Sequence, residues 1–364
     1  MTRYRLQVCD LNAIETRTGA WVAECASLLN VFQPYTDPTG KFHRNGKDSY
    51  IDFGVKVYPQ YTYEKLFMDK EGYNGKEAKG AAKRVRQFGK VGVLGSIYRM
   101  GGGGWGNGKA SYIDHVEGCP HSTSKKHLCD CPKIFDRIRT GLWGFAYGQG
   151  VIMEQKDAAM VTEVFRNAYP EIAGTGYSGA PEGIWVRLEN AVYDVMRGED
   201  TKRRVGPNGC ILIDKLNLKG RRPLLRIHLP SGRKLHYLDA YLDEYTPMPW
   251  TDKKTGHQAV GLALHYSQEN DKGIWTDVHT HGGKEFENVV QGIARDILAA
   301  KLLKFERADI PVVGHVHDEG IAVVRNDPFS PGLPEMIDIM SEEESWAPGL
   351  LLGADGFEGS FYHK

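Results

Sequence analysis

Residues 311–327, PVVGHVHDEGIAVVRND, constrain the fold most strongly. Two short β-rich runs meet at acidic residues, and this pattern predicts a β-hairpin with functional groups at its tip. A second strand-like run, residues 5–11, ends at Asp10, and residues 13–32 then carry apolar side chains at helical spacing, which predicts a helix. A sheet that holds these strands side by side would bring the carboxylates of Asp10 and Asp318 together.

Periodicity elsewhere divides the chain into helical and strand-like segments. Helices are expected over residues 76–100, 135–169 and 284–307, and strands over residues 210–242. The glycine run 101–104 ends the first of these helices, because glycine is unfavourable in a helix interior. Residues 105–132, rich in Gly, Ser, His and Cys, predict an inserted loop. The expected fold class is therefore α+β.

The composition is that of a globular protein with one large or two modest cores. The chain has 364 residues, of which 41% are hydrophobic and 25% charged. Lys plus Arg number 46 and Asp plus Glu number 46, so a nucleic-acid surface must come from local clustering. No apolar run approaches the roughly 20 residues of a membrane span. We therefore expect no membrane partner and a cytoplasmic location.

Asp10 and Asp318 are candidate magnesium ligands. Phosphoryl transfer to a hydroxyl requires charge neutralisation on the attacking and leaving oxygens, which two Mg²⁺ ions about 4 Å apart supply. Magnesium prefers oxygen ligands and keeps several waters, so two carboxylates plus substrate phosphates suffice. Each residue alone also has a plainer interpretation, Asp10 as a cap of the following helix and Asp318 as a turn residue.

A basic helix supplies a second set of candidates. Arg86, Lys90, Leu94 and Tyr98 follow one another at four-residue steps and so share a helix face. Arg offers fork-like hydrogen bonds, Lys a mobile charge and Tyr a flat platform, as a triphosphate and a base require. A solvated basic helix is the alternative for this segment alone.

Three segments resemble the signatures of family A DNA polymerases, especially phage and bacterial enzymes related to DNA polymerase I. CDLNAIETRTGAWVA resembles motif A, RQFGKVGVLGSIYRMG motif B and HVHDE motif C. The resemblance extends over most of the chain, from about Leu6 to Asp327. It implies a right-hand polymerase architecture with an antiparallel palm sheet, formed by residues 1–60 and 206–364, and helical fingers, formed by residues 61–205.

Motifs A and C imply roles at the reacting atoms. The resemblance makes Asp10 and Asp318 the ligands of two Mg²⁺ ions, with the backbone carbonyl of Leu11 as a further ligand. Glu15 is expected to pack against the sugar and exclude a 2′-hydroxyl. His317 is expected to lie towards the primer end.

Motif B implies the nucleotide contacts. Arg86 and Lys90 are expected on the incoming triphosphate and Tyr98 near the template base. Tyr50, in KDSYIDF, occupies a position where family members often have a histidine near the triphosphate.

The helix before motif C carries Gln291 and Arg295, four residues apart on one face. We predict that both contact the primer or template backbone. The alternative is that Gln291 and Arg295 are exposed on the helix and bind nothing. The expected partners are primer–template DNA and deoxynucleoside triphosphates.

The leading functional prediction is DNA synthesis at a primer 3′-hydroxyl. Family members carry a thumb, and often an exonuclease, before motif A, which here begins at about residue 7. We therefore expect a split polymerase, from a bacterial or phage-infected cell, whose thumb and possibly exonuclease belong to a separate polypeptide. A non-catalytic accessory subunit is one alternative. A single-subunit RNA polymerase is another, against which Glu15 and the DE of HVHDE argue.

The inserted loop offers chemically suitable zinc ligands, namely Cys119, His121, His127, Cys129 and Cys131. One residue, rather than the usual two, separates the last two cysteines. A zinc site and a surface loop with free thiols both remain open.

Overall fold

The computed structural model describes residues 4–106, 138–251 and 257–362. It has two compact units, the first formed by residues 1–29 and 174–364 and the second by residues 30–173. The division expected from sequence has boundaries after residues 60 and 205, whereas these units break after residues 29 and 173. The described elements mix helices with antiparallel sheets, in agreement with an α+β class.

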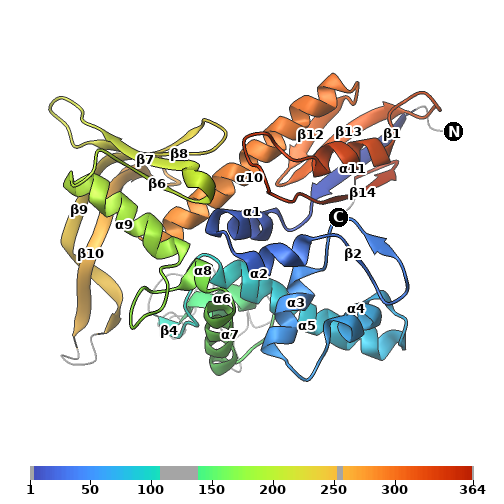
Figure 1. Ribbon diagram of the computed structural model, residues 1–364, viewed down its shortest axis with the longest axis horizontal. Coiled ribbons are helices and arrows are strands. Elements are labelled where there is room, and N and C mark those ends of the chain that lie inside the picture. The colour runs from blue at the N-terminus through green and yellow to red at the C-terminus, as the bar shows by residue number, and fades with distance from the viewer. Residues whose placement is uncertain (1–3, 107–137, 252–256, 363–364) are drawn as a thin grey trace. The chain divides into compact units, whose positions relative to one another are not determined.

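A four-stranded antiparallel sheet in the first unit contains both predicted acidic strands. Its order is β12 (Val312–Val316), β13 (Glu319–Arg325), β1 (Tyr4–Leu11) and β14 (Ala354–Gly359). The predicted hairpin is confirmed, since β12 pairs with β13, and β13 pairs directly with β1. Helix α11 (Leu333–Ser341) packs against β1 and β14 (Figure 1).

A six-stranded antiparallel sheet makes up most of the remainder of the first unit. Its order is β11 (Trp275–Thr280), β10 (Gln258–Glu269), β9 (Lys234–Thr251), β8 (Leu224–His228), β7 (Ile211–Leu216) and β6 (Lys202–Val205). The strand prediction over residues 210–242 is thus confirmed. Between β6 and β7 lies a short 3₁₀ turn, η2 (Pro207–Gly209).

Two long helices pack against this sheet and against each other. They are α9 (Ile184–Arg197) and α10 (Gly282–Arg307), and α10 also contacts α1 and the β12–β13 hairpin. The helix predicted over residues 284–307 therefore exists and begins two residues earlier. Its buried face includes Phe286, Val290, Ile293 and Ile297, at the three- and four-residue spacing of an amphipathic helix.

The single helix predicted over residues 13–32 is wrong. The structure has α1 (Ile14–Ala23), α2 (Ala26–Leu29) and the 3₁₀ helix η1 (Asn30–Phe32) instead. Glu24 adopts a left-handed conformation, with φ 58°, and its N–H donates back to Ala20 and Trp21. This backbone reversal ends α1 although the apolar periodicity continues past it.

The described part of the second unit is mostly helical. Its elements are β2 (Tyr35–Thr36), β3 (Phe42–His43), α3 (Ser49–Val57), α4 (Tyr63–Glu71), α5 (Gly75–Ser96), β4 (Trp105–Gly106), β5 (Ile138–Arg139), α6 (Gly141–Gly148), α7 (Gln155–Ala168) and α8 (Pro170–Ala173). Helix α5 packs against α3, α4, α6 and α7. None of the helices in the described ranges is long and apolar enough to cross a membrane.

Glycines on α5 permit this close packing. A Cβ at Gly89 would lie 1.9 Å from the carbonyl oxygen of Tyr50, and one at Gly92 would lie 2.7 Å from the Phe53 ring. Both partners belong to α3. Because Gly89 has no side chain, α5 can approach the backbone of α3 closely at this point.

Two helix predictions in this unit need correction. Helix α5 ends at Ser96, not at residue 100. The segment predicted as one helix from residue 135 is divided among β5, α6 and α7, with Gly150 in a left-handed conformation between the two helices. Pro170 starts α8 instead of only stopping a helix, since proline is well tolerated in a first turn.

Candidate functional site

Strand pairing brings the two predicted metal ligands to neighbouring chain segments. The N–H of Leu11, next to Asp10, donates to the carbonyl oxygen of Asp318 over 3.2 Å. The cap of α1 is Ala13, which makes no side-chain capping bond, so the structure does not support Asp10 as a helix cap. The side chain of Leu11 is buried.

Carboxylates surround Asp10 in the sheet. Asp10 lies opposite Glu319 on β13 and opposite Asp355 on β14. Burial, with the carboxylates of Asp10 and Asp355 nearby, raises the pKa of the Cys9 thiol to about 12. The thiol therefore stays neutral, and the electrostatic field at this edge of the sheet favours a cation.

The chemistry of these donors fits magnesium. Carboxylate and carbonyl oxygens are hard ligands, and Mg²⁺ completes its shell with water and substrate oxygens. Among the described residues no group of three or more His, Cys, Asp or Glu side chains is arranged to hold a metal by itself. The Cys/His-rich loop lies outside the described residues.

A hollow of about 310 Å³ in the first unit collects five residues that the sequence singled out. Its lining consists of Ile14, Glu15, Gln291, Ala294, Arg295, His317 and Asp318. They come from α1, α10 and the turn between β12 and β13. The Gln291 side-chain amide donates to the Glu15 carboxylate over 2.5 Å, which joins α10 to α1.

His317 has a left-handed backbone conformation, which is uncommon for residues other than glycine. It begins the two-residue turn between Val316 and Glu319, with φ 54° in the left-handed region. Such a conformation costs a non-glycine residue on the order of 1 kcal/mol and often marks functional sites. The turn presents His317 and Asp318 together to the hollow. Sequence reasoning had no signal for this conformation.

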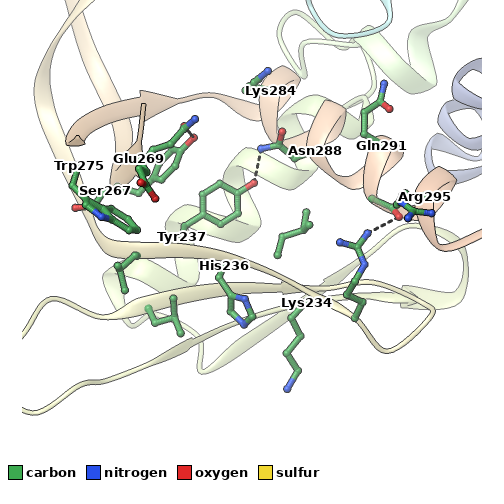
Figure 2. Close-up of a pocket in the computed structure, with 17 residues that line it drawn as sticks. Lys234, His236, Tyr237, Ser267, Glu269, Trp275, Lys284, Asn288, Gln291 and Arg295 are labelled. Atoms are coloured by element: carbon green, nitrogen blue, oxygen red, sulfur yellow. Dashed lines mark hydrogen bonds between the residues drawn. The ribbon is translucent and has the colours of Figure 1, made fainter. Parts of the chain in front are cut away.

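A second, larger hollow of about 990 Å³ lies between α10 and strands β8 to β11 (Figure 2). Gln291 and Arg295 line both hollows, so the two adjoin along α10. Across the larger hollow, the Asn288 amide donates to the Tyr237 hydroxyl over 3.0 Å. Sequence reasoning missed this hollow, although Lys284, spaced at helical intervals from Asn288 and Gln291, marks the same face.

The predicted nucleotide contacts belong to the second unit. Arg86 and Lys90 lie one turn apart on α5 and are half-buried, whereas Tyr98 lies past the C-cap at Ile97. The Arg86 guanidinium lies 5.2 Å from the centre of the Tyr50 ring. The close approach of α3 to α5 accounts for this contact.

An aspartate that sequence reasoning did not single out holds Arg86. The Nε of Arg86 donates to Oδ2 of Asp48 over 2.6 Å. The other carboxylate oxygen, Oδ1, accepts from the backbone N–H groups of Tyr50 and Ile51 and so caps α3. An Asp three residues before an apolar helical face is a capping signal that sequence reasoning could have used.

Comparison with known proteins gives one curated relative. Over 141 residues, which are 39% of this chain and 20% of the relative, the sequence is 38% identical to a DNA polymerase of Bacillus phage SP02. The match thus spans about a fifth of that polymerase. No family model matches the sequence.

Among solved structures, this chain aligns with the POL domain of Pol1 from M. smegmatis, which was solved in complex with DNA primer-template and dNTP. The alignment covers 99% of this chain and 40% of the Pol1 chain. The TM-score is 0.44 and the sequence identity 11%. The sequence relative supports the resemblance to DNA polymerases over those 141 residues. The chain is therefore related in sequence to a phage DNA polymerase, as its family A-like motifs indicate.

Proposed function

We propose that the chain catalyses template-directed DNA synthesis by adding deoxynucleotides to a primer 3′-hydroxyl through two-metal nucleotidyl transfer. The hollow that collects Glu15, Gln291, Arg295, His317 and Asp318 carries this proposal. These residues lie up to about 300 positions apart in the sequence, and each has a proposed role in polymerisation. The relative named a DNA polymerase supports the same reaction class.

Asp10 and Asp318, with the carbonyl of Leu11, would hold two Mg²⁺ ions. When bound, such ions lower the pKa of an attacking hydroxyl and neutralise a leaving pyrophosphate. The carboxylates at Glu319 and Asp355 add negative charge around Asp10 and so favour cation binding.

The residues of the second unit would bind the nucleotide. Arg86 and Lys90 neutralise charge on the triphosphate, and Tyr50 and Tyr98 provide flat surfaces beside it. Positive charge that is fixed before the reaction needs no reorganisation as charge moves to the leaving group.

Primer–template DNA would lie along α10. Arg295 forms no ion pair with any described residue, so its guanidinium is available to a phosphate. Gln291 and Arg295 line both hollows, so a phosphate bound by Arg295 would lie where the two hollows adjoin. His317, in the turn, would face the primer end.

A separate polypeptide is proposed to supply the thumb and possibly an exonuclease. The curated match covers 39% of this chain and 20% of the phage polymerase, so the aligned region is only a part of both proteins. Each phosphate contact adds to duplex affinity, so a protein that makes few such contacts binds duplex DNA weakly at physiological salt. Weak binding of primer–template by this chain alone is the expected consequence.

Primer extension with Mg²⁺ and deoxynucleotides tests the proposed function. The chain is assayed alone and with extract from its source, and Asp318→Ala serves as the control. Extension that needs the extract and is lost in the variant supports a split polymerase. Extension by the chain alone, lost in the variant, supports the activity but not the split arrangement. No extension in either setting would favour a non-catalytic accessory role.

Glu15→Ala is expected to relax the choice of sugar. The carboxylate is held by Gln291, and its removal opens space where a 2′-hydroxyl would lie. Selectivity for deoxynucleotides over ribonucleotides should fall roughly 10- to 100-fold, the range over which a pocket rejects one added hydroxyl. Gln291→Ala, which removes the partner but keeps the carboxylate, is the matched control and should have a smaller effect. Unchanged selectivity in Glu15→Ala would contradict the assigned role.

A further inference from the structure

Asp48 connects the start of one helix to a cation on another. Its Oδ1 accepts from the N–H groups of Tyr50 at 3.1 Å and Ile51 at 3.3 Å, which fixes the carboxylate at the N-terminus of α3. Its Oδ2 accepts from Nε of Arg86 on α5 at 2.6 Å. The Asp48 side chain is only 13% exposed, whereas that of Arg86 is 33% exposed.

This geometry leaves the outer part of the guanidinium available. A carboxylate bound to Nε occupies one of the five N–H donors of arginine. Within the described residues, the structure gives the two terminal Nη groups no hydrogen-bond partner. The ring of Tyr50 lies beside the same guanidinium, 5.2 Å from it, and limits its rotation. Arg86 is thus oriented from one side while its other donors remain open to an anion.

We propose that Asp48 is a positioning residue that orients Arg86 for the triphosphate of the incoming nucleotide. The inference rests on the proposed function and deepens it. Arg loses considerable rotamer freedom when it binds an anion, and a side chain that is already oriented loses less. Planar two-point contact with phosphate oxygens also requires a defined guanidinium plane. Lys70, whose Nζ is 3.7 Å from Oδ2, offsets part of the negative charge of Asp48.

A plain capping role is the competing explanation, and Asp48→Asn separates the two. Asparagine caps helices about as well as aspartate, so α3 should keep its N-terminus. The variant loses the charged acceptor for Arg86. Asp52→Asn is the matched control, because Asp52 lies on the same helix and pairs with Lys56 on the surface over 2.6 Å.

The experiment is a double-mutant cycle of Asp48→Asn and Arg86→Gln. Steady-state extension gives kcat and KM, and equilibrium binding of a deoxynucleotide to a complex with a chain-terminated primer gives Kd without turnover. We expect Asp48→Asn to raise KM and Kd about 10-fold, the usual effect of losing a charge-assisted hydrogen bond, with kcat nearly unchanged. In the Arg86→Gln background the same substitution should have no further effect, because its action depends on Arg86.

Additive effects in the cycle would overturn the proposal, as would an Asp48→Asn variant that matches Asp52→Asn in Kd. If Asp48→Asn lowered the melting temperature enough for partial unfolding to explain its higher Kd, that result would also count against the proposal. Failure here is distinguishable from failure of the proposed function. Asp318→Ala tests extension independently, and the Kd measurement requires no catalysis.

Discussion

Asp10→Asn is expected to reduce the rate of primer extension on the order of 10³-fold, because ion-dependent stabilisation of the transition state amounts to several kcal/mol and each tenfold in rate to about 1.4 kcal/mol. Asparagine keeps the shape of aspartate but lacks the negative charge that Mg²⁺ requires. Folding stability should not fall, since the substitution removes one negative charge from a sheet edge shared with Glu319 and Asp355. Single-turnover extension and thermal unfolding measure the two effects.

Asp355→Asn is the control for this prediction. Asp355 is the same residue type, lies directly opposite Asp10 on β14, and accepts a hydrogen bond from Asn12 over 2.8 Å. The loss of its charge changes the local field but removes no proposed ligand, so extension should fall at most a few-fold. Equal losses in the two variants would contradict the assignment of Asp10 as the ligand.

Gly89→Ala is expected to destabilise the protein by about 3 kcal/mol, at the upper end for overpacking, because the new methyl group meets backbone instead of a flexible side chain. Its Cβ would lie 1.9 Å from the carbonyl oxygen of Tyr50. Relief requires α3 and α5 to separate, which would also part Arg86 from Asp48. Nucleotide affinity should therefore fall together with stability in urea unfolding.

Gly80→Ala, on the same helix, should stabilise the protein, in contrast to Gly89→Ala. A Cβ there would meet only the Arg84 side chain, at 3.8 Å. Alanine restricts the unfolded chain and favours the helix, so a gain of about 0.5–1 kcal/mol is expected. If both variants changed stability alike, the contact between Gly89 and α3 would not be the cause.

Much of the local structure follows from the sequence. The strand before Asp10, the helix that carries Gln291 and the hairpin around Asp318 were all expected, because side-chain periodicity acts over neighbouring residues. The break in the first helix was not expected, since Glu24 reverses the backbone without a glycine or proline to announce it.

The pairing of distant groups could only come from the tertiary structure. Glu15 and Gln291 lie 276 positions apart, and Asp48 and Arg86 lie 38 apart. Their contacts depend on how α1 meets α10 and how Gly89 lets α5 approach α3. The sequence by itself determined which residue types stand at the candidate site and on which elements. Packing decided which of them meet, because side-chain contacts between elements are set by the close fit of a whole core and by no local pattern.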